Sequence, residues 1–241
     1  MLRGKVGVPA GPMRLSGLVN VACAITNGLV ERSIHLEVLQ GRKLSCQAGC
    51  GACCRHMVPI SAPEAFHIAD VVERLAPPRR ALVEQRFDAI VARLEREHMV
   101  AELLDPSFTS DPYLPVARKY FSLQTACPFL EDESCTIHAD RPVTCRDYNV
   151  TSPAAWCARP YEHEVAKVPT PMPLAVPLAR LTSRLTGLRP QLIPLTLAPR
   201  WVGEHDDIRR RVWPGPELLD GLLAEMGAPG AATRPGSGAS Q

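Results

Sequence analysis

Cysteine is the residue type whose spacing points most directly to chemistry in this chain of 241 residues. Four thiols lie close together in the pattern Cys46-x3-Cys50-x2-Cys53-Cys54, and four more follow at wide intervals, at Cys127, Cys135, Cys145 and Cys157. Thiolates at such short spacing repel one another, and a bound cation removes that repulsion and lowers their pKa. We therefore predict that these eight cysteines are the metal ligands of the protein.

The alternative use of so many cysteines is a disulfide framework. That solution suits small secreted domains with too little hydrophobic core, whereas a chain of 241 residues can bury a core of its own. The mildly apolar run from Leu15 to Ile25 is interrupted by Ser16 and Asn20, and no stretch is apolar over the ~18 to 20 residues that span a bilayer. We expect a cytoplasmic protein with no membrane partner, in which clustered thiols bind metal.

The identity of the metal is left open by the spacing. Structural zinc sites usually show two short C-x2-C pairs, and only Cys50 and Cys53 form one here. The run C-x3-C-x2-C, with a later Cys127-Pro128, is typical of iron–sulfur ligation, in which a distal cysteine often precedes proline. Radical S-adenosylmethionine enzymes share the first spacing, but no alternating series of strands and helices follows it here. The cofactor is expected to be an iron–sulfur cluster or zinc.

Two metal centres are suggested by the adjacent thiols Cys53 and Cys54, because neighbouring cysteines do not comfortably hold one ion together. Local spacing then predicts a first set of Cys46, Cys50, Cys53 and Cys127. The second predicted set is Cys54, Cys135, Cys145 and Cys157, the four thiolates of a closed tetrahedral site.

Two further residue types near the cysteines are candidates for a role at the metal. His56 and His138 have side chains that suit zinc and iron, although an ordinary hydrogen-bonded role is favoured for both. Arg141 and Arg146 are predicted either to hydrogen-bond the sulfurs or to pair with neighbouring aspartates. Cys23, remote from the cluster in the sequence, is expected to be a core residue.

The order of these motifs resembles a known family. The residues that carry the resemblance are Cys46 to Cys54, Val58 to Ser61, Glu64, Cys127 to Leu130, Cys135 to His138, Arg141-Pro142 and Cys145-Arg146. Over about Leu44 to Cys157 the chain is similar to the YkgJ-type cysteine-cluster family, the zinc- or iron-chelating CxxCxxCC domain. The resemblance implies metal binding and leaves the metal open.

Function beyond metal binding comes from that resemblance alone. Flagellin lysine methylases are similar in carrying such a cluster, which implies a role in protein modification and a protein substrate or partner. The alternative is a structural zinc module that serves as a protein-interaction domain without catalysis. No catalytic residue is identified, since the sequence has no phosphate loop, Ser–His–Asp arrangement or H-E-x-x-H motif.

Helical periodicity dominates the first half of the chain. Apolar spacing predicts a helix from about Arg14 to Gln40, ended by Gly41. The capping box Ser61-Ala-Pro-Glu64 predicts a second helix to about Leu75. Pro77 and Pro78 should open a third, running to about Leu104 with His98 packed in its core stripe, which comprises Val83, Phe87, Ile90, Leu94 and Ala101. The loop from Cys46 to Cys54 leaves no room for a regular element.

Shorter elements are predicted in the second half. We expect a short helix ending near Phe121 and a β-hairpin around a polar turn between Cys127 and His138. Arg141-Pro142 and Ser152-Pro153 should open helical turns that carry Cys145 and Cys157. Further helices are predicted from Leu178 to Leu188 and from Pro216 to Met226.

Composition supports a globular protein, since 46% of residues are hydrophobic and 22% are charged. A net charge of +2 gives no reason to expect nucleic acid, and the run Arg209 to Arg211 is interpreted as a solvated helix face. The predicted fold class is mainly α with a small β-hairpin, in a single compact domain organised around a cysteine-ligated metal centre. Its expected parts are an N-terminal helical segment (1–45), a cysteine-cluster domain (46–157), a proline-rich extension packing on it (158–226) and a disordered tail (227–241).

Overall fold

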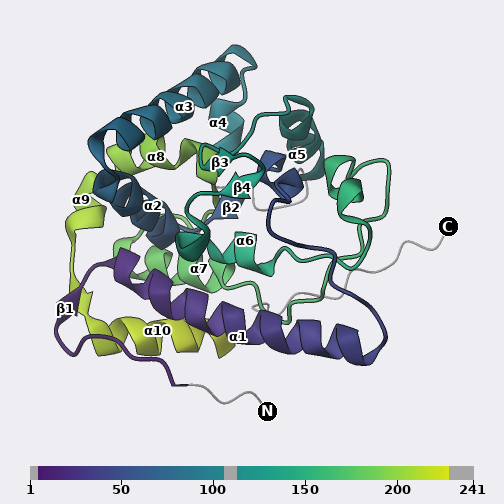
Figure 1. The fold of residues 1–241 in the computed structure, drawn as a ribbon. Coiled ribbons are helices and arrows are strands. Elements are labelled where there is room, and N and C mark those ends of the chain that lie inside the picture. The colour runs from purple at the N-terminus through teal and green to yellow at the C-terminus, as the bar shows by residue number, and fades with distance from the viewer. Residues whose placement is uncertain (1–4, 106–112, 228–241) are drawn as a thin grey trace.

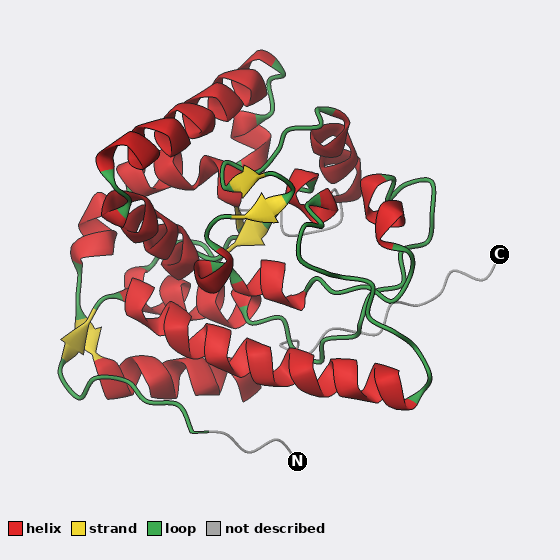
Figure 2. Ribbon diagram, viewed as in Figure 1, coloured by secondary structure: helices red, strands yellow, loops and turns green. Residues whose placement is uncertain are grey.

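The computed structural model describes residues 5–105 and 113–227 of the chain. Within these ranges the protein is mainly α-helical and forms a single compact domain, which confirms the predicted fold class (Figures 1 and 2). Beyond Gly227, the predicted disordered tail lies outside the described residues. No helix in the described ranges has both the length and the apolar character needed to cross a membrane.

The N-terminal half begins with the long helix α1 (Leu18–Leu39), which follows a 3-10 turn at Leu15–Gly17. Gly41 adopts a φ of +78°, the left-handed conformation in which glycine commonly ends helices, and this confirms the predicted boundary. Helix α2 (Ala62–Arg74) starts at the predicted capping box, in which Ser61 and Glu64 bond reciprocally.

The third helix is shorter than predicted. Helix α3 (Pro77–Arg96) buries the predicted stripe as far as Leu94, but His98 has a φ of +55° and a separate short helix, α4 (Val100–Leu103), follows it. This left-handed residue turns the chain so that Met99 becomes fully buried. His98 and Ala101 therefore lie exposed, and their predicted places in the core were wrong.

The cysteine-rich part of the chain contains short elements only. Helix α5 (Tyr113–Ser122) precedes the predicted hairpin, made of β3 (Leu130–Glu131) and β4 (Ser134–Cys135). Both turn residues of the hairpin have positive φ, as tight hairpin turns require. Cys145 lies on α6 (Val143–Asp147) and Cys157 on a 3-10 turn (Ala154–Ala158), both as predicted. A further 3-10 turn (Ala52–Arg55) lies in the first cysteine loop, where none was expected.

The C-terminal part is more helical than its proline content indicated. Helix α7 (Ala175–Thr186) and helix α10 (Gly215–Gly227) match the predicted ones, but α8 (Ala198–Glu204) and α9 (Asp206–Arg210) were not predicted. The interpretation of Arg209 as solvated was wrong, because its guanidinium is 12% exposed and bonds Asp70 and Glu73 on α2.

Two antiparallel strand pairs join distant parts of the chain. Strand β1 (Pro12–Met13) pairs with β6 (Trp213–Pro214), and β2 (Pro59–Ile60) pairs with β5 (Ile193–Pro194). Each pair spans only two residues per strand, so the alternating pattern that signals strands in a sequence is absent. These pairs attach the C-terminal part to the N-terminal helices.

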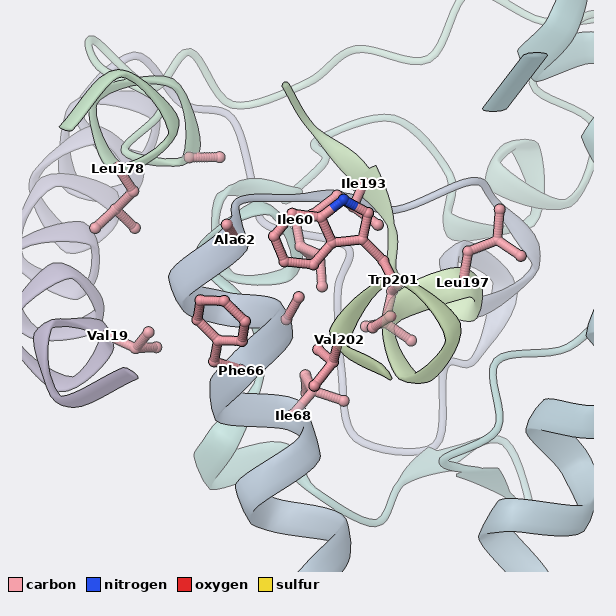
Figure 3. Close-up of a cluster of buried hydrophobic side chains, with 14 of the residues drawn as sticks. Val19, Ile60, Ala62, Phe66, Ile68, Leu178, Ile193, Leu197, Trp201 and Val202 are labelled. Atoms are coloured by element: carbon pink, nitrogen blue, oxygen red, sulfur yellow. The ribbon is translucent and has the colours of Figure 1, made fainter. Parts of the chain in front are cut away.

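The main core lies between α2 and the C-terminal helices (Figure 3). Phe66 of α2 is fully buried and its ring lies 5.5 Å from that of Trp201 on α8. Burial of a side chain of this kind stabilises the fold by about 1.5–3 kcal/mol. Ile60 and Ile193, from the paired strands β2 and β5, are also fully buried. Phe129, Ile137 and Val143 from the cysteine-bearing segments belong to the same core, and Cys127 and Cys135 pack against it.

Candidate metal centre

The first cysteine loop is joined by hydrogen bonds to the hairpin and to the last cysteine segment. The amide of Cys127 donates to the carbonyl of Cys54 over 2.8 Å, which joins the hairpin to the first cysteine loop. Nε2 of His56 lies 2.7 Å from the carbonyl oxygen of Cys157, which joins the same loop to the third segment. The structure thus brings these segments into one region, as expected from the sequence.

Gly51 sets how closely the loop approaches the hairpin. It is buried, and a Cβ at this position would lie 2.7 Å from Cδ1 of Leu130 and 2.6 Å from Oε2 of Glu133. Arg55 spans the same contact, with Nη2 2.6 Å from Oε1 of Glu133. Cys50 and Cys53, the neighbours of Gly51 in the loop, are therefore held against the hairpin.

The hairpin holds Cys127 and Cys135 on one short β-turn unit. Leu130 pairs with Cys135 across the strands, and its amide donates to the carbonyl of Cys127 over 2.9 Å. Phe129, which lies between the two cysteines in the sequence, is buried, and the centroid of its ring lies 5.6 Å from that of Phe87 on α3. The hairpin therefore has a fixed position against the helices.

Helix α6, which carries Cys145, is attached to α2 by a buried carboxylate. Oε1 of Glu64 accepts the amide of Val143 over 2.9 Å, while Oε2 accepts the amide of Ser61 over 2.7 Å. The hydroxyl of Thr144 donates to the carbonyl of Pro59 over 2.7 Å. The capping box predicted for α2 thus also positions a cysteine 81 residues further along the chain.

Cys157 is buried, and after burial it is one cause of the raised pKa of Tyr148, which indicates that the two side chains are near each other. The Tyr148 ring lies edge-on to His56, with 5.6 Å between the ring centroids, and Nζ of Lys167 lies 5.0 Å from its centre. The sequence did not indicate that Tyr148 and Cys157 lie near each other, because the chain between them is irregular.

The predicted arginines take other roles. Arg146 donates to the carbonyls of Arg141 and Ala139 and to Oδ1 of Asn27, and Nε of Arg141 donates to the carbonyl of His138. Neither forms an ion pair with an aspartate within the described residues. The pKa values of Cys46, Cys53 and Cys135 are raised, chiefly by burial and, for Cys53, by Cys54, and the positive charge of Arg141 opposes part of that rise.

Burial opposes ionisation of most of the thiols. It raises the pKa values of Cys46, Cys135, Cys145 and Cys157, and that of Cys127 to about 12. For Cys53 the largest cause of a raised pKa is its hydrogen bond with Cys54. Free thiols in such surroundings stay protonated near neutral pH, whereas a bound cation would stabilise the thiolates.

After burial, the sulfur that most widely raises the pKa values of the others is that of Cys53, which acts on Cys46, Cys127, Cys135, Cys145 and Cys157. Cys46 and Cys50 also raise the pKa of Cys157, and Cys127 and Cys135 also raise that of Cys145. How the ligands divide between two centres stays a prediction.

The donor set suits zinc and iron, because thiolates bind both and all the cysteines are free. Among the residues that the structure describes, no group of three or more metal-binding side chains is arranged to hold an ion as it stands. Binding would require these side chains to turn toward a common point. That the eight cysteines ligate metal remains a prediction.

The two candidate histidines and Cys23 lie near the cysteine segments without a metal-binding arrangement among the described residues. His56 bonds a main-chain oxygen, which is the ordinary role favoured for it, and His138 is exposed. The thiol of Cys23 lies 3.7 Å from the carbonyl oxygen of Arg141 and is buried, as expected of a core residue.

Sequence reasoning did not single out Asp147 as a ligand. Within the described residues both of its carboxylate oxygens are buried without a partner, and burial raises its pKa to about 7.

The fold and the site together define a helical protein with a thiol-rich region packed on its hydrophobic core. The chain belongs to the CxxCxxCC family, described as "Putative zinc- or iron-chelating domain", whose family model matches residues 45–167. The suspected family is thereby confirmed, and metal chelation is the general property that it supports. Comparisons with curated proteins and with solved structures give no match.

Proposed function

We propose that the protein binds zinc or iron through eight thiolates. The ligands are Cys46, Cys50, Cys53, Cys54, Cys127, Cys135, Cys145 and Cys157. The observation that carries the proposal is the meeting of three irregular segments. The amide of Cys127 donates to the carbonyl of Cys54, and Nε2 of His56 lies within hydrogen-bond distance of the carbonyl oxygen of Cys157. These segments have only short regular elements, so a metal would supply a cross-link between them.

The nature of the cofactor can be decided by one experiment. The protein is purified without air, and iron, zinc and acid-labile sulfide are measured beside the visible spectrum. A brown protein with iron and sulfide would have an iron–sulfur cofactor, whereas a colourless protein with zinc would have the closed thiolate sites of a structural module. A fully folded protein that holds neither metal and takes up neither would refute the proposal.

A structural zinc module that presents a protein-interaction surface is the second candidate. Supporting it, the segments that carry the thiols also contact α2 through Glu64 and α3 through Phe129. A centre closed by four thiolates organises structure, while catalysis at a metal needs an open position. A role in protein modification rests on the family resemblance, and it would require the iron–sulfur outcome together with an open iron.

The predicted cytoplasmic location belongs to the same proposal, because free thiols persist in a reducing compartment. Locating a tagged full-length chain by cell fractionation would test this part independently of metal content.

A further inference from the structure

We propose that a cavity at the end of α8 binds a small organic acid, in which a single carboxylate is joined to an apolar body. The cavity has a volume of about 320 Å³ and lies between the end of α4, the connection from α7 to β5, and the last turn of α8. Pockets for small molecules typically measure about 300–1,000 Å³, so this one suits a ligand at the lower end of that range. None of the described residues that line it belongs to a cysteine segment, so the inference goes beyond metal binding.

The apolar part of the cavity wall is continuous with the hydrophobic core. Leu104 and Leu188 line the cavity and pack against the core cluster. Trp201 also lines it, and its ring is held against Phe66 of α2, with 5.5 Å between the ring centroids. An apolar body between these side chains would be removed from water, and that removal supplies affinity without fixing the orientation of the ligand.

Arg189 supplies a cation at the edge of this apolar wall. It is exposed, and it forms no ion pair with any residue that the structure describes. Other arginines of the same region are already paired, since Arg184 lies 3.5 Å from Glu225 and Arg200 bonds Glu95. A free guanidinium can form two parallel hydrogen bonds with one carboxylate, which would fix the orientation of the acid.

The connection that carries Arg189 is short and fixed at both ends. Helix α7 ends at Gly187, whose φ of +78° is the left-handed conformation that commonly closes a helix. Strand β5 begins at Ile193, which is fully buried and paired with β2. Gln191 lines the cavity from the same connection, and its side-chain amide can donate a further hydrogen bond to a carboxylate.

His205 offers a nitrogen with a fixed direction. Its ring stacks on that of Trp201, with 3.9 Å between the centroids and 14° between the planes, and Nδ1 lies 2.7 Å from the carbonyl oxygen of Trp201. Because a carbonyl oxygen only accepts hydrogen bonds, Nδ1 carries a hydrogen. Nε2 forms no hydrogen bond with the described part of the chain, so it is available to a ligand and donates when the ring is protonated.

Glu204 limits the charge that the cavity can accept. Its Oε1 lies 3.9 Å from Nε of Arg200, which also bonds Glu95 on α3, so these charges nearly balance. A doubly charged anion such as phosphate would approach Glu204 with little excess positive charge nearby, whereas a single carboxylate needs only Arg189. A cationic ligand would meet Arg189 and gain only a carboxylate that is already paired.

The test measures the binding of three small probes to the full-length protein by saturation-transfer NMR titration. Benzoate has the proposed chemistry, benzyl alcohol is its neutral analogue, and benzylamine is its cationic analogue. Benzoate should bind at least about tenfold more tightly than the other two, because a charge-assisted hydrogen-bonded pair contributes a factor of this order. No binding of benzoate, equal binding of benzyl alcohol or tighter binding of benzylamine would each overturn the proposal.

Variants show whether the binding takes place at this cavity. Arg189→Gln should weaken benzoate binding by roughly 10–100-fold and leave that of benzyl alcohol unchanged. The matched control is Arg32→Gln, at an exposed arginine of α1 that does not line the cavity, and it should bind benzoate as the wild type does. Leu188→Ser should weaken the binding of both probes, with circular dichroism as the check on folding. Wild-type affinity for benzoate in Arg189→Gln would refute the assignment. Metal content should be the same in all of these proteins, so failure here leaves the proposed metal binding untouched.

Discussion

Tyr148 lies near one thiol of the candidate centre, because Cys157 is, after burial, a cause of the raised pKa of the Tyr148 phenol. If Cys157 is a metal-bound thiolate, we expect the Tyr148 hydroxyl to donate to its sulfur. Removing such a partner of a ligand typically costs about 10–100-fold in metal affinity. We predict a loss of this size for Tyr148→Phe, measured by competition with a chelator.

The matched control is Tyr161→Phe, because the Tyr161 ring contacts Phe121 and Arg118 and no cysteine contact is recorded for it among the described residues. Its affinity should equal that of the wild type. Equal affinities for Tyr148→Phe and the wild type would show that the hydroxyl does not act on the metal-bound sulfur.

The buried side chain of His67 on α2 is expected to make the stability of the fold depend on pH. Burial lowers its pKa below 6.5, although Asp140, with Oδ1 3.3 Å from Nε2, opposes the shift. The fold thus prefers the neutral ring, and the unfolded chain takes up a proton first as the pH falls. The stability contributed by the neutral ring is present above pH ~6.5 and is lost as the pH falls toward the lowered pKa of the folded state.

We therefore expect the free energy of urea unfolding to fall less between pH 7.5 and 5.5 in His67→Gln than in the wild type. Each variant is compared with itself at the two pH values, which removes any constant effect of the substitution. His98→Gln, at an exposed histidine, should behave as the wild type does. An unaltered pH dependence in His67→Gln would contradict the argument.

At the scale of elements, Glu64 connects two helices through one carboxylate. It is 1% exposed and accepts the amides of Ser61 and Val143, at the starts of α2 and α6. In Glu64→Gln, the amide group would face at least one of these donors and leave it unsatisfied. We predict a loss of about 1–3 kcal/mol in the free energy of unfolding, measured with urea.

Glu84→Gln is the control for that substitution, because Glu84 is exposed and pairs only with Arg80 among the described residues. Its effect should stay within about 0.5 kcal/mol of the wild type. If Glu64→Gln were equally mild, the buried carboxylate would not be what joins the two helices.

Gly51 tests the contact between the first cysteine loop and the hairpin. In Gly51→Ala, the new methyl group would lie less than 3 Å from side-chain atoms of Leu130 and Glu133. It would also lie 3.1 Å from the main-chain Cα of Glu133 in the hairpin turn. We predict that the loop moves away, at a cost of about 1–3 kcal/mol, with a parallel fall in bound metal. Unfolding free energy and metal content are measured on the same preparations.

The matched variant is Gly203→Ala on α8, where an added Cβ meets no atom within 4 Å. It should keep full metal content and be neutral or slightly more stable, because alanine favours a helix. Full metal content in Gly51→Ala would show that the close approach of the loop is not needed for binding.

At the scale of the whole molecule, most of the hydrophobic core is supplied by helices outside the cysteine segments. Phe66 and Trp201 lie on α2 and α8, while the cysteine segments have short elements only and add a few side chains such as Phe129 and Val143. We predict that removing the metal lowers the Tm without abolishing the helical fold. A loss of about 3 kcal/mol would lower the Tm by roughly 6–12 °C for a chain of this size.

Two measurements on the chelated protein check this. Far-ultraviolet circular dichroism should retain most of its helical signal, and amide exchange should increase in the cysteine segments while α2 and α8 stay protected. An unchanged Tm after complete metal loss would contradict a structural role for the metal. Complete unfolding would instead show that the core depends on the centre.

Short-range features of the chain were predictable from the sequence. The capping box at Ser61, the end of α1 at Gly41 and the hairpin before Cys135 depend on residues within a few positions of one another. The close spacing of Cys46 to Cys54 likewise identified a thiol cluster, because the chemistry of neighbouring thiols needs no knowledge of the fold. Mainly helical structure followed from apolar periodicity, which is also a local property.

Long-range features were decided only by the tertiary structure. The pairing of β2 with β5, the burial of Met99 after the turn at His98, and the contact of the first cysteine loop with Cys157 through His56 all depend on packing, which no local pattern encodes. Spacing therefore predicted which cysteines would bind metal, while the contacts that bring the hairpin and the last turn to the first loop came from the tertiary structure. The physical reason is that ligand sets closed by distant segments are selected by three-dimensional distance and not by position along the chain.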